Sequence, residues 1–351
     1  MSNDKKVRWG IIGPGGIAQA FRAGVLEADN AELVAIGSRN PGKPELKDNF
    51  PEARIHDGYQ ALIDDADVDA IYIATPHPGH AEWAVKAADG GKHVLSEKPM
   101  AMSAGEASTM FAAAARNNTF MGEAFMYRLH PQTTKLIELL KSGVIGEVRM
   151  IKSSFGFALP FDANHRLYAN HLGGGGILDV GCYPASMTRL IAGTAADKSF
   201  LDPDIVHGVA HLGQTGVDEW ASAVLQFSSG IIAEISCSVA LNQENVLRIV
   251  GTKGRLEVAD FWFAGGKEGG TGKIDIVGGD GKRETIEVTD TSHLYKFEAE
   301  SASAAILAGK QEFDAPGMSW ADTMGNMRVL DKWRLDAGLL YGVETPQPEA
   351  K

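Results

Sequence analysis

The stretch "WGIIGPGGIAQAF", residues 9–21, carries the pattern that decides the fold. A short apolar run with the composition of a buried strand leads into a glycine-rich turn, and a helix-like segment follows. The G-x-G-x-x-A spacing permits a tight turn, lets a pyrophosphate approach the backbone and allows the helix to pack on the strand. The N-terminus of that helix would attract the anion. The stretch therefore predicts a dinucleotide site whose contacts are Gly13, Gly15, Gly16, Ile17 and Ala18.

The first 125 residues alternate strand-like and helix-like segments. The strand-like segments are 7–12, 32–37, 69–74, 92–97 and 119–124. One of the helix-like segments opens with Ser103 three residues before Glu106, which is the pattern of an N-terminal capping box. Strands that are apolar on both faces and alternate with helices indicate a parallel sheet covered on both sides. We expect residues 1–125 to form a Rossmann dinucleotide-binding domain of α/β type.

The remainder of the chain has a different pattern. After an amphipathic segment at 130–143, strand-like segments follow one another with only turns between most of them, at 147–157, 204–213, 218–227, 230–240, 245–252 and 255–260. This pattern predicts a second domain, residues 126–351, of α+β type with a large open, mostly antiparallel sheet. Two helical segments close the chain, and we expect them to pack back on the first domain. The glycine-rich stretch 265–273 lacks phosphate-loop spacing and is expected to be a mobile hairpin loop.

Composition excludes several classes of protein. A chain of 351 residues suits two domains, and its formal charge of −12 argues against a nucleic-acid or anionic-membrane partner. Two cysteines make neither a disulfide framework nor a metal knuckle, so no metal is expected. No apolar run is long enough to span a membrane, and the N-terminus lacks a secretory signal. We expect a cytoplasmic protein.

The end of the second strand indicates which dinucleotide is bound. An NAD site usually places a carboxylate there for the ribose 2′-hydroxyl. This chain has "AIGSRNPGK" at 35–43, in which Ser38 can hydrogen-bond a phosphate, Arg39 can pair with it and Lys43 can assist. The alternative is a solvated arginine in a surface turn. The missing acid favours NADP over NAD.

Two further stretches carry residues suited to catalysis. "HVLSEKPM", residues 93–100, ends a strand with Glu97 and Lys98, and the following proline restricts the conformation of the lysine. The alternative is a surface Glu–Lys pair beside a turn. "HLGGGGILDVGCYPASMTRLIAG", residues 171–193, places Asp179 and Tyr183 four apart, on one face of a helix, after four glycines. The bare glycines would let a substrate approach the backbone.

Together these motifs resemble the glucose–fructose oxidoreductase/inositol dehydrogenase family (Gfo/Idh/MocA). The resemblance extends over nearly the whole chain and includes "YIATPHPGHAEWAVKAADGGKHVLSEKP" at 72–99, "GEAFMYRLHPQ" at 122–132 and "SGVIGEVRMIKSSFGF" at 142–157. It implies that Lys98 and Tyr183 flank the reacting carbon with Asp179 beside them, and that the Lys98–Pro99 bond is cis. Many members have histidine at the Tyr183 position. In having tyrosine at this position, the chain resembles the dimeric dihydrodiol dehydrogenase and D-xylose dehydrogenase branch, several members of which use NADP.

The chemistry of the three side chains agrees with these roles. A phenol with a pKa of ~10 is a poor base unless a cation stabilises the phenolate, and Lys98 would supply that cation. Asp179 would orient the substrate or hold Lys98. Tyr183 could instead be a half-buried aromatic, and Asp179 a helix N-terminal acid favoured by the dipole.

The resemblance also implies secondary contacts. Thr75, Pro76, His77, His80 and Glu97 would contact the cofactor, although a histidine could equally cap a helix. Arg128 and Arg166 are candidates for sugar binding or for interface ion pairs.

The sequence therefore predicts an NADP-dependent oxidoreductase that transfers a hydride to or from a sugar or related cyclic alcohol. A dihydrodiol-type or ketosugar reductase with a non-sugar substrate is the second hypothesis, and a non-catalytic NADP-binding regulatory protein is the third. Alternating apolar residues such as those of "GIIAEISCSV", 230–239, leave a sheet face that few helices remain to cover. An exposed apolar face of that size predicts a homodimer.

Overall fold

The computed structural model describes residues 5–342. Its first sheet has six parallel strands in the order β3-β2-β1-β4-β5-β6. The strands are β1 (Val7–Ile12), β2 (Ala31–Ser38), β3 (Arg54–Asp57), β4 (Ala70–Ile73), β5 (His93–Glu97) and β6 (Met121–Ala124). The predicted parallel sheet is confirmed. The sequence prediction missed β3, because none of its four residues is fully buried and it has no apolar periodicity.

Helices cover both faces of this sheet, and as a consequence every residue of the central strand β4 is buried. They are α1 (Gly16–Glu27), α2 (Glu45–Asn49), α3 (Tyr59–Ile63), α4 (Gly79–Asp89) and α5 (Ala104–Asn117). The predicted cap of α5 is present, because the Ser103 hydroxyl accepts the backbone N–H of Glu106 at 3.3 Å. Helix α8 (Lys296–Leu307) returns from the end of the chain and packs on α1, so closely that a Cβ on Gly24 would lie 2.4 Å from the backbone of Tyr295.

The second sheet has eight strands in the order β14-β13-β12-β11-β7-β10-β9-β8. They are β7 (Val148–Gly156), β8 (Ile205–Leu212), β9 (Asp218–Gln226), β10 (Ile232–Ser238), β11 (Val246–Gly251), β12 (Gly254–Ala259), β13 (Gly270–Gly278) and β14 (Arg283–Asp290). Only β7 and β10 pair in parallel among these strands, so the mostly antiparallel sheet is confirmed.

The glycine-rich stretch 265–273 is only partly a loop. Residues 270–273 already belong to β13, a strand that the sequence prediction missed. Gly272 lies inside that strand, where a Cβ would be 1.6 Å from the side-chain oxygen of Gln132. The glycines of this stretch therefore have two roles: they allow the turn before β13, and they allow β13 to pack closely against α6.

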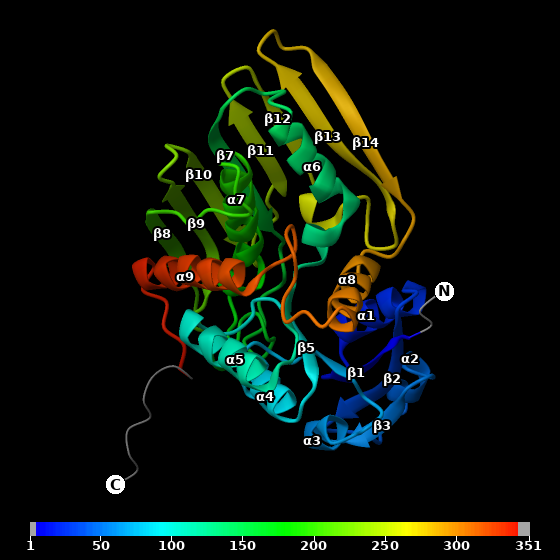
Figure 1. Ribbon diagram of the computed structural model, residues 1–351. Helices are drawn as coiled ribbons and strands as arrows, with labels where there is room; N and C mark the ends of the chain where they lie inside the picture. The colour runs from blue at the N-terminus through cyan, green and yellow to red at the C-terminus, as the bar shows by residue number, and fades with distance from the viewer. Residues whose placement is uncertain (1–4, 343–351) are drawn as a thin grey trace.

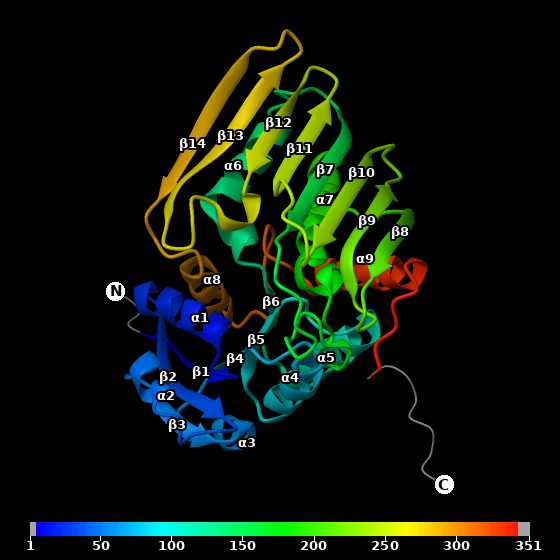
Figure 2. The same ribbon diagram turned by 180° about the vertical axis from the view of Figure 1, so that it is seen from behind.

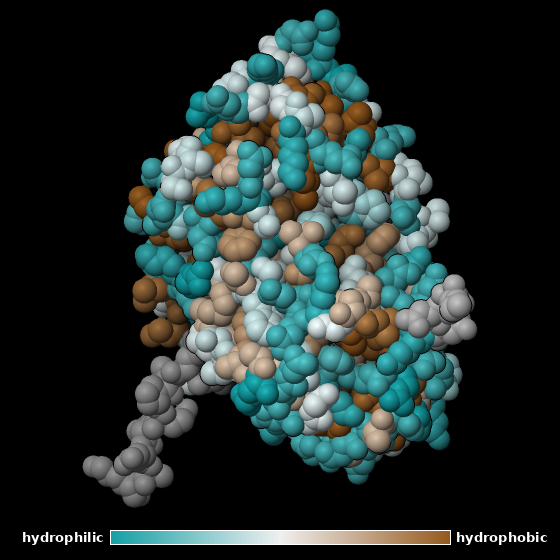
Figure 3. All heavy atoms as spheres, viewed as in Figure 1, coloured by the Kyte–Doolittle hydropathy of each residue, from teal (hydrophilic) through white to brown (hydrophobic). Residues whose placement is uncertain are grey.

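One face of the second sheet carries helices and the other is open. Helices α6 (Pro131–Lys141), α7 (Cys182–Thr194) and α9 (Trp320–Asp336) lie on the side seen in Figure 1, and Figure 2 shows the uncovered face. On the helix-covered side the surface of the first domain is mostly hydrophilic, and apolar residues gather more on the second domain (Figure 3). The second domain therefore has one buried and one exposed sheet face.

Candidate active site

The glycine turn has the geometry that the sequence predicts. Gly13 has φ +83°, and a Cβ there would lie 2.8 Å from the carbonyl oxygen of Ala74, which directly follows the neighbouring strand β4. The Gly15 N–H donates to the Gly13 carbonyl at 2.7 Å, and α1 begins at the next residue. Ala18 is fully buried between helix and sheet. The first turn of α1 therefore offers backbone N–H groups and a positive dipole end to an anion.

The end of β2 lies beside this turn, because Ile12 of β1 pairs with Gly37. Ser38 is buried, and its hydroxyl accepts the N–H of Asn40 at 3.1 Å. Arg39 and Lys43 are exposed, and their side chains make no ion pair within residues 5–342. The Arg39 guanidinium lies 6.0 Å from the ring centroid of Tyr59. Two cations thus remain available to a phosphate group.

A cavity of about 440 Å³ extends from the glycine turn to the boundary between the domains. Both domains contribute to its wall, which is formed by Gly15, Gly16, Ile17, Ala74, Thr75, Pro76, His77, His80, Glu97, Lys98, Arg166 and Asp179. The Thr75 hydroxyl is buried and has no hydrogen-bond partner in the described part of the chain. An unpaired buried hydroxyl beside a helix N-terminus fits a polar ligand such as a dinucleotide.

Lys98 joins the two domains at the inner end of this cavity. The Lys98–Pro99 bond is cis, as the resemblance implies. The Lys98 ammonium donates to the main-chain carbonyl of Asp179 at 2.6 Å and lies 3.5 Å from that residue's carboxylate. Burial alone would lower the pKa of Lys98, but the electrostatic attraction of Asp179, Cys182 and Glu97 together outweighs it, and the pKa lies above the usual lysine value. The lysine therefore stays cationic.

Asp179 is an ionised acceptor in a cluster of cations. Its carboxylate lies 3.1 Å from the Arg166 guanidinium and 3.8 Å from Nε2 of His77. Burial alone would raise the pKa of Asp179, but the charges of Lys98 and Arg166 hold it well below its usual range. Asp179 thus positions Lys98 and Arg166, and Arg166 is half-exposed at the cavity wall.

Tyr183 lies beside Lys98, whose Nζ is 5.2 Å from the centroid of the phenol ring. The ring is buried among aromatic side chains at centroid distances of 5.3 to 5.6 Å, namely Phe125, Tyr127, Phe155 and Trp262. Its hydroxyl points at the sulfur of Met126, 3.6 Å away, and Tyr183 does not line the cavity.

Burial raises the pKa of the Tyr183 phenol well above its usual value. The pKa therefore lies above its usual value and not below it as the sequence led us to expect, because desolvation is the main cause and the neighbouring Glu97 and Asp179 carboxyls raise it further. The phenol is therefore a protonated group, suited to donate a proton.

The four glycines do not expose bare backbone, which corrects the sequence expectation. All four are buried against the protein itself. Gly175 has φ +107°, and a Cβ there would lie 2.0 Å from the Asp218 carboxylate. That carboxylate accepts the N–H of Ile177 at 2.6 Å, at the start of the helical turn that carries Asp179. The glycines make room for the buried Asp218. In the sequence Asp218 is the first residue of a strand with alternating apolar residues, and nothing there marks it as a neighbour of the glycines.

Arg128 is not a substrate ligand in this structure. It is fully buried, donates to the Pro316 carbonyl at 2.7 Å and to the Ser186 hydroxyl at 2.9 Å, and pairs with Asp322. Arg128 does not line the cavity, because its guanidinium is already bonded to Pro316, Ser186 and Asp322. The sequence around Arg128, just before α6, gives no sign of these partners, which lie far along the chain.

Both histidines line the cavity wall and are bonded to backbone carbonyls. Nδ1 of His77 is 2.9 Å from the Gly173 carbonyl. His80 lies between the carbonyls of Thr75 and Pro99, at 2.9 Å from each. Burial lowers the pKa of His77 to about 3 and that of His80 to about 4. A neutral imidazole has a single N–H, so each histidine donates to one backbone carbonyl, and His80 donates to either Thr75 or Pro99 and not to both.

Within residues 5–342, no group of three or more His, Cys, Asp or Glu side chains is arranged to hold a metal ion. The same residues include no helix that is long and apolar enough to cross a membrane.

The dinucleotide turn and the interdomain cavity define the class, a two-domain nucleotide-binding oxidoreductase. The model for the oxidoreductase family with an NAD-binding Rossmann fold matches residues 7–125, and the GFO/IDH/MocA C-terminal domain model matches residues 133–257. The chain belongs to the GFO/IDH/MocA family of oxidoreductases.

Relatives of known activity span both domains. D-xylose 1-dehydrogenase (NADP(+)) 2 of Haloferax volcanii is 32% identical over 92% of this chain and 95% of its own length. Trans-1,2-dihydrobenzene-1,2-diol dehydrogenase of Xenopus laevis is 30% identical over 95% of this chain and 99% of its own. A 3-ketoreductase from Actinomadura kijaniata, crystallised with NADP and TDP-benzene, superposes with a TM-score of 0.84 at 28% identity, over 95% of this chain and 98% of its own.

Proposed function

We propose that this protein transfers a hydride between NADP and the CH–OH or carbonyl carbon of a sugar or related cyclic alcohol. The observation that carries the proposal is that Lys98 and Asp179, one from each domain, line the end of a cavity that begins at the dinucleotide turn, with the Tyr183 ring 5.2 Å from the Lys98 ammonium. The NADP-dependent D-xylose dehydrogenase and the NADP-bound ketoreductase support both the cofactor and the substrate class.

The residues present fit the cofactor. The N-terminus of α1 would hold the pyrophosphate, and Ser38, Arg39 and Lys43 would hold the 2′-phosphate. Thr75, Pro76, His77, His80 and Glu97 would form the wall around the nicotinamide. When bound, NADP supplies or accepts the hydride.

Each catalytic side chain has a separate task. In reduction the neutral Tyr183 phenol, whose hydroxyl must turn from Met126 toward the cavity, donates a proton to the carbonyl oxygen, and in oxidation the phenolate takes the proton back. The Lys98 ammonium hydrogen-bonds the substrate oxygen and stabilises the phenolate once the proton has left. Asp179 holds Lys98 and Arg166, and Arg166 is placed to bind a substrate hydroxyl.

Fluorescence of bound NADPH, followed by turnover with a panel of aldoses, ketosugars and trans-dihydrodiols, tests this function. We expect binding and turnover with at least one cyclic sugar. Turnover of dihydrodiols alone would favour the second hypothesis, which the amphibian dihydrodiol dehydrogenase supports. Binding without any turnover would indicate the regulatory protein.

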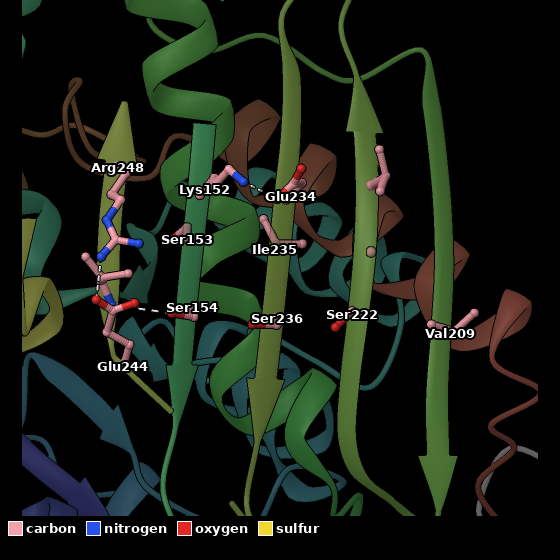
Figure 4. Close-up of a pocket in the computed structure, with 13 residues that line it drawn as sticks. Lys152, Ser153, Ser154, Val209, Ser222, Glu234, Ile235, Ser236, Glu244 and Arg248 are labelled. Carbon is pink, nitrogen blue, oxygen red and sulfur yellow. Dashed lines mark hydrogen bonds and ion pairs between the residues drawn. The ribbon is translucent and has the colours of Figure 1, made fainter. Parts of the chain in front are cut away.

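We also propose that a second copy of this chain covers the open sheet face. Val209, Trp220, Val224 and Ile232 are exposed there, on β8, β9 and β10. Figure 4 shows a hollow in this face where Lys152 pairs with Glu234 at 2.9 Å and Arg248 pairs with Glu244. Apolar residues with interspersed charges of both signs suit a self-complementary interface.

A further inference from the structure

The shortest contact of the Lys98 ammonium is with a backbone carbonyl inside a helical segment. That carbonyl, of Asp179, accepts the ammonium at 2.6 Å and also the Cys182 thiol at 3.6 Å. The carboxylate of the same residue is farther from the ammonium, at 3.5 Å. A carbonyl within a helix normally accepts a backbone N–H, so two side-chain donors at one carbonyl call for a local cause.

The cause lies in the helix type and in one proline. Residues Ile177–Gly181 form a π-helical turn, and α7 begins directly after it. Two backbone N–H groups of a regular chain could reach the Asp179 carbonyl, the one four residues further on, as in an α-helix, and the one five residues further on, as in a π-helix. The first belongs to Tyr183, and the second position is Pro184, in the first turn of α7, which has no N–H. The same proline also lies four residues after Val180, so it removes the α-helical donor at the neighbouring carbonyl.

We propose that Pro184 is a positioning residue for Lys98. By withholding one of the two backbone donors in reach, it leaves a lone pair of the Asp179 carbonyl oxygen to the ammonium, and Nζ lies between Asp179 and the Tyr183 ring. The first turn of α7 tolerates the proline, because N–H groups at helix starts lack partners within their own helix. The inference rests on the proposed function for the role of Lys98, but its structural part needs no substrate.

Crystal structures of Pro184→Ala and Pro184→Ser test the proposal, with Pro131→Ala as the matched control. Pro131 is the first residue of α6, where a restored N–H has no carbonyl within its helix to bond. We expect the new N–H of residue 184 to bond the Asp179 carbonyl, and the Lys98 ammonium to move beyond hydrogen-bond distance of that oxygen. The control should leave the ammonium in place.

Kinetics on the same variants separate positioning from folding. With a substrate in hand, kcat of Pro184→Ala should fall about tenfold while KM and NADPH affinity stay within a few-fold, and the pKa of Lys98 should fall because the ammonium has lost an acceptor. An ammonium that keeps its bond to the Asp179 carbonyl in both Pro184 variants would overturn the proposal. If no substrate is found, the proposed function fails, and the crystal structures still decide the role of Pro184.

Discussion

Arg39 is the residue that should distinguish NADPH from NADH. Its guanidinium makes no ion pair in the described structure and lies at the end of β2, where NAD sites place an acid. We expect Arg39→Asp to weaken NADPH binding by at least tenfold and to leave NADH binding within a few-fold, because a carboxylate repels a 2′-phosphate. Fluorescence titration with both cofactors measures this. Equal losses for the two would remove Arg39 from the phosphate site.

The titration of individual side chains sets the dependence on pH. Burial raises the pKa of Tyr183, so its phenol stays protonated across neutral pH and reduction should be flat there, falling only in alkaline solution. Oxidation needs a proton acceptor and should rise with pH. His77 and His80, with pKa values of about 3 and about 4, should give no inflection between pH 5 and 8. An inflection near pH 6.5 would not by itself implicate a histidine, since burial raises the pKa of the Asp218 and Glu123 carboxyls to about 7. An inflection that disappears in His77→Asn or His80→Asn would assign the proton transfer to that histidine.

At the level of single residues, the sequence predicted those whose chemistry is contained in a short motif. Gly13 and Lys98 lie in stretches whose local spacing already requires a turn or a fixed lysine. Of the two alternatives for Arg128, the structure shows an ion pair and not a sugar contact, and local spacing could not decide between them because the partner Asp322 lies 194 residues away.

Among the structural elements, the π-helical turn before α7 depends on a buried carboxylate. Gly175→Ala would drive a Cβ to within 2.0 Å of Asp218 at a backbone φ of +107°. We expect a loss of about 3 kcal/mol in the free energy of unfolding, from overpacking and backbone strain together. Urea denaturation measures this loss.

Gly281→Ala is the matched control for that change. Gly281 also has a positive φ, +80°, but a Cβ there would meet open space. Backbone strain alone should cost about 1 kcal/mol. Similar losses at the two glycines would show that Asp218 does not fill the space beside Gly175.

The same turn shows that the sequence can predict a helix without predicting its type. The spacing of Asp179 and Tyr183 indicates a helix, and a helix is present, but every residue of Ile177–Gly181 and of α7 is buried, so no apolar periodicity distinguishes a π-turn from an α-turn. Strand β14 was missed because its residues are mostly exposed, which leaves little apolar alternation to detect.

For the whole molecule, the open face of the second sheet should join two copies. Val224→Asp places a charge among the exposed apolar residues of β8, β9 and β10, and we expect it to weaken dimerisation at least tenfold because the carboxylate would be buried. Leu26→Asp is the control, since Leu26 is 56% exposed on α1 of the first domain. Sedimentation velocity over a range of concentrations reports the result. A dimer that persists in Val224→Asp would place the interface elsewhere.

The arrangement of the two domains brings Lys98 of the first and Tyr183 of the second together, and catalysis at that meeting point is the central claim. Single-turnover hydride transfer in Tyr183→Phe and Lys98→Ala, with NADPH affinity measured on the same samples, tests it most directly. We expect transfer to fall by about 10³-fold in each variant, with NADPH affinity within a few-fold of the unaltered protein. Unchanged rates of transfer in both variants would contradict the account.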